Sequence, residues 1–132
     1  MLHGVASTDT VVTAEACLYW GTAALSPPTN LAFTASAIVS YDPVQGIMAF
    51  NGNGSGGGTW TVAANTLLTG QWVTLKVEQN FATKTWKLFV NGVEKLNGLG
   101  FKDNAVSQIT GIHARSGVGE SLYCDDVTIQ KQ

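Results

Sequence analysis

Charge is scarce in this sequence of 132 residues. Asp, Glu, Lys and Arg together make up 12% of it, about half the share of an average globular protein. The formal net charge is −2, and the seven Lys and Arg residues are scattered along the chain. Nucleic-acid binding needs clustered cations against the phosphates, so no nucleic-acid partner is expected. Because hydrophobic residues reach 45%, the low charge indicates a folded protein with an uncharged surface rather than disorder.

Long hydrophobic runs are also missing. No apolar stretch approaches the roughly 20 residues of a membrane-spanning helix, so membrane insertion is not expected. Residues 1–4 lack the basic and apolar regions of a signal peptide. We therefore expect either a mature domain with an added Met or a naturally short protein. An uncharged β-protein of this kind is typical of the extracellular space or the cell surface.

Helical periodicity is absent as well. The longest candidate, 18–24, contains Gly21 and runs into two prolines, and short β-type runs alternate with turn residues elsewhere. The 15 glycines fit many tight turns. The spacing predicts about eight to ten strands in one domain, as in a β-sandwich or jelly roll. The clearest expected ranges are 10–20, 32–41, 46–50, 59–63, 72–78, 85–90, 93–96, 108–114 and 122–130.

Residues 71–92 give the strongest local signals. Alternation predicts two inward-facing triplets, and they are Val73, Leu75 and Val77, then Trp86, Leu88 and Val90. Asn91-Gly92 predicts a tight hairpin between two of the strands. The glycine-rich stretch 51–58 is expected to be a flexible loop or a hairpin tip, because neither a Lys-Ser/Thr pair nor a helix follows it as in a phosphate-binding loop.

Two of these segments resemble a known family. The stretch QWVTLKV (71–77), followed by TWKLFVNG (85–92), resembles the laminin-G-like domains of the concanavalin A-like lectin/glucanase superfamily. The later stretches GLGF (98–101), ITGI (109–112) and YCDDVTI (123–129) are similar to the final strands of that family. The resemblance implies a single all-β domain over 1–132, built as an antiparallel two-sheet jelly-roll sandwich with one concave sheet. Members bind glycans or proteins, serve as spacers in secreted proteins, or hydrolyse glycosides.

The start of the chain departs from the family pattern. Such domains usually begin with strands that pair with the C-terminal strand, and only residues 1–9 precede the first expected strand here. We expect residues 1–9 to be flexible or to pair along a sheet edge, and the sandwich to lack its usual N-terminal strand. An open edge pairs readily with another copy or with a peptide, which predicts a homo-oligomer formed by strand addition.

Catalytic carboxylate pairs are not evident. Glycoside hydrolases use two carboxylates that flank the scissile bond, and the Glu-x-Asp-x-x-Glu strand of hydrolases with this fold does not occur here. Asp125 and Asp126 are neighbours on an expected strand and would point to opposite faces. His3 and His113 are accompanied by no Gly-x-Ser-x-Gly elbow. We therefore expect that the protein is not an enzyme.

Sugar binding would use an exposed aromatic ring with amide groups beside it. Trp60, which follows three glycines, is the first candidate, and Tyr41 and Trp20 come next. Asn51 and Asn53 are the expected hydrogen-bonding partners. The alternative is that the tryptophans belong to the core.

A cation and a disulfide are two further expectations. Some domains of this kind bind calcium at a loop rim, and Asp42, Asp103 and Asn104 would supply oxygen ligands, although turn formation explains the same residues. No other cofactor is expected. Cys17 and Cys124 either form a disulfide that closes most of the chain into one loop or are two buried free thiols.

These observations predict a non-catalytic binding or adhesion module of a secreted or surface protein, with a glycan or a protein as its partner. The alternative is a structural subunit of a filament, surface layer or virion that assembles through an open sheet edge. The two differ in a testable way, because a lectin keeps a free aromatic ring whereas an assembling subunit buries apolar surface between copies.

Overall fold

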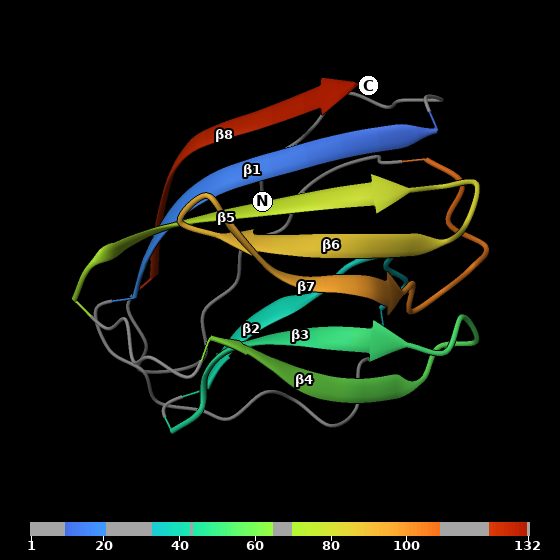
Figure 1. Cartoon of the computed structure of the whole chain (residues 1–132), viewed down its shortest axis with the longest axis horizontal. Helices are drawn as coiled ribbons and strands as arrows, with labels where there is room; N and C mark the ends of the chain where they lie inside the picture. The colour runs from blue at the N-terminus through green and yellow to red at the C-terminus, as the bar shows by residue number, and fades with distance from the viewer. Residues whose placement is uncertain (1–9, 21–32, 43, 65–69, 109–121, 132) are drawn as a thin grey trace.

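A computed structural model of the chain describes residues 10–20, 33–42, 44–64, 70–108 and 122–131. These ranges form eight strands and no helix (Figure 1), so they hold no helix that is long and apolar enough to cross a membrane. The strands are β1 (Val11–Trp20), β2 (Val39–Asp42), β3 (Gly46–Gly52), β4 (Gly58–Ala64), β5 (Trp72–Asn80), β6 (Thr85–Val90), β7 (Val93–Gly100) and β8 (Leu122–Lys131).

The strands form two antiparallel sheets, which confirms the all-β class. One sheet has five strands in the order β7-β6-β5-β1-β8, and the other has three in the order β2-β3-β4 (Figure 1). β1 pairs with β5 on one side and with β8 on the other. β8 is an outer strand of the five-stranded sheet in the described part of the chain. The prediction that the domain lacks its usual N-terminal strand concerns residues 1–9, which lie outside the described residues, so it stays a prediction.

Most expected strands are present with small shifts at their ends, and 32–41 is the main exception. Only Val39–Asp42 of that range pairs as a strand. Upstream of it, the carbonyl oxygens of Ala35 and Ser36 accept hydrogen bonds from the backbone N–H groups of Asp103 and Lys102, each at 3.0 Å. This stretch therefore follows a loop instead of a strand. Residues 1–9 and nearly all of the strand expected at 108–114 lie outside the described residues.

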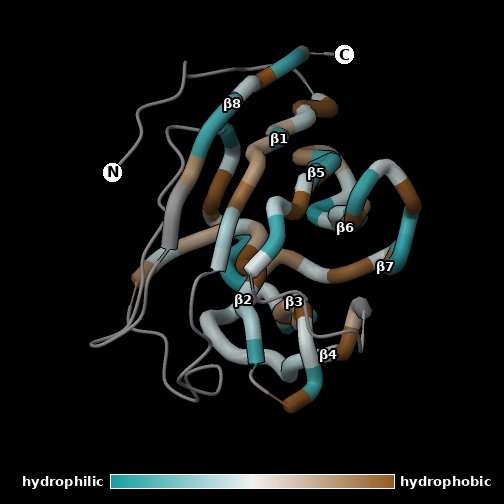
Figure 2. Tube along the Cα trace, turned by 90° about the vertical axis from the view of Figure 1, so that its left-hand side faces the viewer, coloured by the Kyte–Doolittle hydropathy of each residue, from teal (hydrophilic) through white to brown (hydrophobic). Residues whose placement is uncertain are grey.

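One hydrophobic core is shared by the two sheets. Both predicted triplets point into it: Val73 and Leu88 are 0% exposed and Trp86 is 1% exposed. The three-stranded sheet contributes Ile47 and Ala49, which are also 0% exposed. Full burial of one such side chain larger than Ala stabilises the fold by roughly 1.5–3 kcal/mol, so these residues determine which sheet face lies inside. Hydrophobic and hydrophilic residues alternate along β5 (Figure 2), as a strand with one buried face requires, whereas β3 is buried continuously from Gly46 to Phe50.

The hairpin between β6 and β7 turns at Asn91-Gly92, as predicted. Both residues have positive φ, 50° and 81°, as a two-residue hairpin turn of type I′ requires. The Asn91 side-chain oxygen accepts a hydrogen bond from the Thr74 backbone N–H at 3.0 Å, which joins the turn to β5.

The glycine-rich stretch 51–58 is the tip of the β3–β4 hairpin, and it packs against 100–104. The Gly54 N–H donates to the Phe101 carbonyl at 2.9 Å, and the Gly56 N–H donates to the Lys102 carbonyl at 2.8 Å. A Cβ at Gly52 would lie only 2.3 Å from the Phe101 carbonyl oxygen. The glycines thus permit direct contact between two backbone segments, and of the two predicted forms the hairpin tip is the one found.

Candidate functional site

The outer face of the five-stranded sheet carries the side chains that alternate with the core residues. Trp72 precedes the buried Val73 on β5, and Tyr19 precedes the buried Trp20 on β1. We define the outer face by the residues of β1, β5, β6, β7 and β8 that share these positions. They include Glu15, Cys17, Tyr19, Trp72, Thr74, Lys76, Glu78, Lys87, Phe89, Glu94 and Asp125.

Trp72 and Tyr19 form an aromatic pair on this face. They are direct partners in the β1–β5 register, and their ring centroids are 5.5 Å apart with planes inclined by 53°. The Trp72 side chain is 53% exposed, whereas Tyr19 is half-buried. The tyrosine thus supports the indole from one side while about half of the Trp72 surface remains in contact with water.

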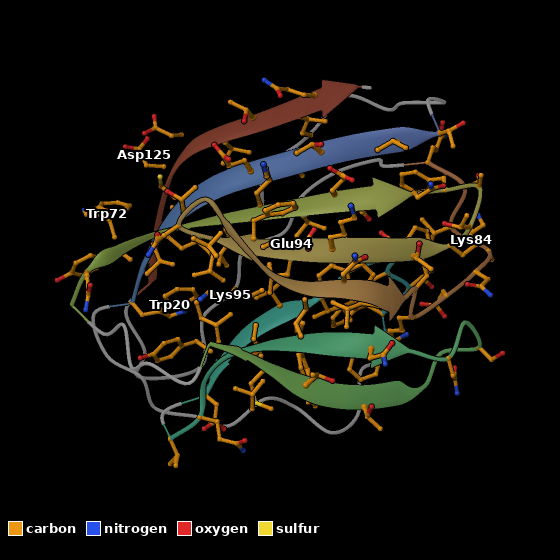
Figure 3. All side chains as sticks on the ribbon, viewed as in Figure 1. Trp20, Trp72, Lys84, Glu94, Lys95 and Asp125 are labelled. Carbon is orange, nitrogen blue, oxygen red and sulfur yellow. The ribbon has the colours of Figure 1, made fainter. Side chains whose placement is uncertain are left out.

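A row of small polar groups lies next to the aromatic pair. Cys17 is in register with Thr74 on β5 and with Asp125 on β8. The Cys17 sulfur lies 3.3 Å from the Thr74 hydroxyl oxygen. This row is two residues along the strands from the aromatic pair, or roughly 7 Å. Figure 3 shows Trp72 and Asp125 at the same end of the sheet.

The charged part of the outer face lies further along the strands. The Lys76 ammonium is 4.2 Å from the centroid of the Phe89 ring. The Lys87 ammonium lies 3.6 Å from a Glu78 oxygen and 3.8 Å from a Glu94 oxygen. Lys76 and Lys87 therefore already have partners within the sheet.

Two of the three predicted aromatic ligand residues lie in the core. Trp20 is 9% exposed and Tyr41 is 7% exposed, and their rings stack with centroids 4.9 Å apart and planes inclined by 21°. The prediction that these rings stack on a sugar is wrong, because the core and the partner ring cover their faces. Trp60 lies on the three-stranded sheet, half-buried and edge-on to Phe50 at 5.2 Å. As a ligand residue, Trp60 stays a prediction.

Asn51 and Asn53 hold the β3–β4 tip together. The Asn51 side-chain oxygen accepts a hydrogen bond from the Gly100 N–H at 2.8 Å. The Asn53 side-chain oxygen accepts bonds from the N–H groups of Ser55 and Gly57 at 2.8 and 3.1 Å. Both oxygens are therefore used in building the turn, which is the ordinary role of Asn in such tips.

The expected calcium ligands do not come together. One oxygen of the buried Asp42 accepts the N–H groups of Val44 and Gln45, both at 2.7 Å, beside the first residue of β3. Asp103 and Asn104 lie at the opposite end of β3, about 20 Å away for a strand of this length. The prediction of one site from these three residues is wrong. Within the ranges described above, no three His, Cys, Asp or Glu residues are grouped as metal ligands.

The environment of Asp103 also disfavours a cation ligand. Burial acts to raise the pKa of Asp103, but a hydrogen bond from the Ala35 N–H and the Lys102 ammonium outweigh burial and lower this pKa below its ordinary value of 3.8. One Asp103 oxygen lies 2.9 Å from the Ala35 nitrogen and 3.1 Å from the Lys102 ammonium. The carboxylate is thus already neutralised by a neighbour of this chain.

Cys17 and Cys124 are free thiols, so the predicted disulfide is not formed. Cys124 is in register with Leu18, and Cys17 is in register with Asp125. Because partners across an antiparallel pair share a face and neighbours along a strand do not, the two thiols point to opposite faces. Cys17 is half-buried and Cys124 is exposed, so the alternative of two buried thiols is also not what the structure shows. Desolvation, and then the charges of Asp125 and Cys17, raise the pKa of Cys124.

Trp72 is the residue that the sequence reasoning missed. The alternation of the strand contains the evidence for it. Because Val73 is predicted to point inward, its neighbour Trp72 must point to the outer face of the same strand. The three glycines before Trp60 favour that residue in the sequence, but they carry no information about its exposure. A comparison with protein-family profiles, curated proteins and solved structures finds no match for this chain.

Proposed function

We propose that this protein is a non-catalytic binding module of a secreted or surface protein, and that it binds carbohydrate through Trp72 and Tyr19. The observation that carries the proposal is the exposure of the Trp72 indole, 53%, in register with a second aromatic ring. A pyranose ring presents C–H groups on its faces and hydroxyl groups at its edges. The apolar face of an exposed indole can pack against the C–H groups. The neighbouring Thr74 and Asp125 can form hydrogen bonds with the hydroxyl groups.

Isolated exposed apolar residues are common on protein surfaces and need no explanation. The Trp72–Tyr19 pair differs because two aromatic rings meet across neighbouring strands at the end of a sheet face, with a polar row beside them. Such a combination of an apolar surface and a few placed polar groups is typical of a ligand site. The laminin-G-like jelly roll is part of the same proposal, and the two sheets with a common core are compatible with it.

The alternative is a self-assembling subunit that pairs through an open sheet edge. β1 covers one side of the C-terminal strand β8, and the other side of β8 is the edge that such an assembly would use. Of the strands that the structure describes, β7 and β8 are the outer strands of the five-stranded sheet, and β8 runs along mostly exposed positions. Light scattering over a concentration series separates the two proposals, since only the assembling subunit gains mass with concentration.

Native affinity electrophoresis tests the carbohydrate proposal. The gels contain hydroxyethylcellulose, pullulan or galactomannan, and the wild type is compared with Trp72→Ala and Trp60→Ala. We expect at least one polymer to retard the wild type and Trp60→Ala, and Trp72→Ala to bind it about tenfold or more weakly, as for a central contact residue. Because Trp72 is half exposed, its replacement is expected to change the unfolding temperature little, which a thermal melt checks.

Two outcomes would count against the proposal. Equal retardation of the wild type and Trp72→Ala would remove Trp72 from the site. Loss of retardation in Trp60→Ala alone would move the site to the three-stranded sheet, as the sequence first indicated.

A further inference from the structure

We infer that the ligand of the Trp72–Tyr19 surface is an uncharged polysaccharide, and that Asp125 selects it over carboxylated polymers. This inference rests on the proposed function and adds the chemical class of the ligand. It follows from the charges beside the aromatic pair.

Asp125 is the carboxylate of the outer face nearest to the aromatic pair. It lies one strand over from β1 and two residues along from the Tyr19 position, because Cys17 is its register partner. With strands about 4.8 Å apart and residues about 3.3 Å apart along each, this corresponds to a backbone distance of roughly 8 Å from Tyr19. A ligand of two or more sugar units that covers the pair would therefore reach Asp125.

The exposure and the hydrogen bonding of Asp125 allow this residue to accept hydrogen bonds from sugar hydroxyl groups. The residue is exposed, and one of its oxygens accepts the Asp126 N–H at 2.9 Å. Within the described residues the second oxygen accepts no hydrogen bond, and it can accept one from a ligand. An ionised carboxylate can only accept hydrogen bonds, and its bonds from hydroxyl groups are stronger than those between neutral groups. Hydroxyl-rich neutral sugars supply such donors, whereas a sugar carboxylate at the same place would meet like charge.

Lys76 and Lys87, the lysines among the outer-face residues named above, are engaged elsewhere on the face. Lys76 stands over Phe89 at 4.2 Å, and Lys87 lies between Glu78 and Glu94. Among the outer-face residues named above, the carboxylates Glu15, Glu78, Glu94 and Asp125 outnumber these two lysines. The Debye length is about 10 Å at 0.1 M salt, so the Asp125 charge acts on a ligand bound at the pair.

A basic peptide is the competing occupant, because a lysine can lie over an indole near carboxylates. The structure favours the sugar for one reason. The row next to the aromatic pair contains one carboxylate, Asp125, and its other two residues, Cys17 and Thr74, are uncharged and lie 3.3 Å apart. This row therefore offers a peptide a place for one cation, whereas it offers a sugar several hydrogen-bonding groups. A lysine-rich peptide is therefore included in the test as a probe of its own.

The test compares neutral polymers with carboxylated derivatives of the same backbone. Hydroxyethylcellulose, pullulan and galactomannan are used before and after oxidation of their C6 hydroxyls to carboxylates. At low salt we expect the wild type to bind a neutral polymer at least threefold more tightly than its oxidised derivative. Asp125→Asn should narrow this ratio toward one. Glu94→Gln removes the same charge on β7, at the opposite edge of the sheet, and should leave the ratio unchanged.

The outcomes separate the inference from the proposed function. Equal binding of neutral and oxidised polymers by the wild type, with both lost in Trp72→Ala, would overturn the inference and leave the proposed function standing. Binding of no polymer, or Trp72-dependent binding of the lysine-rich peptide alone, would overturn both. An unchanged ratio in Asp125→Asn would overturn the role of that residue.

Discussion

Gly52 and Gly100 lie where two backbone segments are in direct contact. A Cβ on Gly52 would be 2.3 Å from the Phe101 carbonyl oxygen, and a Cβ on Gly100 would be 2.3 Å from the Gly52 carbonyl oxygen. Carbon and oxygen atoms do not approach so closely without a bond. A side chain of any size at Gly52 would therefore separate the hairpin tip from 100–104.

We predict that Gly52→Ala lowers the free energy of unfolding by about 2–3 kcal/mol, the usual cost of forcing extra atoms into a packed site. Gly57→Ala is the matched control in the same tip. Its Cβ would meet the Asn53 side-chain nitrogen at 2.9 Å, and a side-chain amide can move away. Urea denaturation measures both variants, and an equal loss in both would contradict the account of backbone contact.

Lys102 and Asp103 form the most buried ion pair of the described chain. The Lys102 side chain is 4% exposed, and its ammonium lies 3.1 Å from Asp103 and donates to the Phe33 carbonyl at 2.7 Å. Burial acts to raise the Asp103 pKa, but the Ala35 N–H and Lys102 lower it below 3.8 overall. Since the pKa is lower in the folded state, ionised Asp103 contributes stability above about pH 4, which is lost as pH falls through the folded-state pKa.

Asp103→Asn removes this titration. We expect the variant to be less stable than the wild type by about 1–2 kcal/mol at pH 7, since it loses a charged hydrogen bond. The difference should shrink as pH falls from about 4 through the lower folded-state pKa, because protonation of wild-type Asp103 favours the unfolded state over that range. Denaturation curves over that pH range check this, and parallel curves for the two proteins would show that Asp103 is not coupled to folding.

At the level of strands, strongly alternating segments are predicted well. The inward triplets of β5 and β6 and the Asn91-Gly92 hairpin follow from local pattern and turn chemistry. The stretch upstream of Val39 is not predicted, because its backbone hydrogen bonds go to Lys102 and Asp103 far along the chain. Local alternation carries no information about such a partner.

The pairing of β1 with β8 is also beyond local pattern. A register shift between Glu15 and Cys17 accompanies the positive φ of 50° at Asp126, as in a β-bulge. This register places Cys17 opposite Asp125 instead of Cys124. Whether two cysteines from opposite ends of a chain can bond depends on such a register, which the sequence does not reveal.

We predict that the protein, denatured without reductant, gives two reactive thiols per chain with Ellman's reagent, since both cysteines are free. In the native state the exposed Cys124 should react slowly at neutral pH and faster as pH rises. The reason is that desolvation, and then the charges of Asp125 and Cys17, raise the pKa of Cys124 above 9.0. Cys124→Ser should lose this native reaction. The absence of any reactive thiol in the denatured protein would mean that the disulfide forms after all.

At the level of the whole molecule, composition and periodicity are sufficient to predict an all-β protein of two sheets around one core. They are not sufficient to predict which aromatic residues are exposed. Trp20 and Tyr41 are buried because the two sheets meet over them, whereas Trp72 is exposed because it lies on the far side of the five-stranded sheet. The site therefore depends on how the sheets face each other, and this can be judged only once the strands are paired.

The four tryptophans of the chain allow the central claim to be tested in one spectrum. Their indole N–H groups give separate signals in a nitrogen-15 correlation spectrum, and Trp72→Phe and Trp60→Phe assign two of them. On titration with an oligosaccharide of the polymer that binds best, we predict that the Trp72 signal shifts. The signal of Trp86, whose indole N–H donates to the Gly100 carbonyl at 3.0 Å in the core, should stay in place. A Trp72 signal that does not move at saturating ligand would contradict the account.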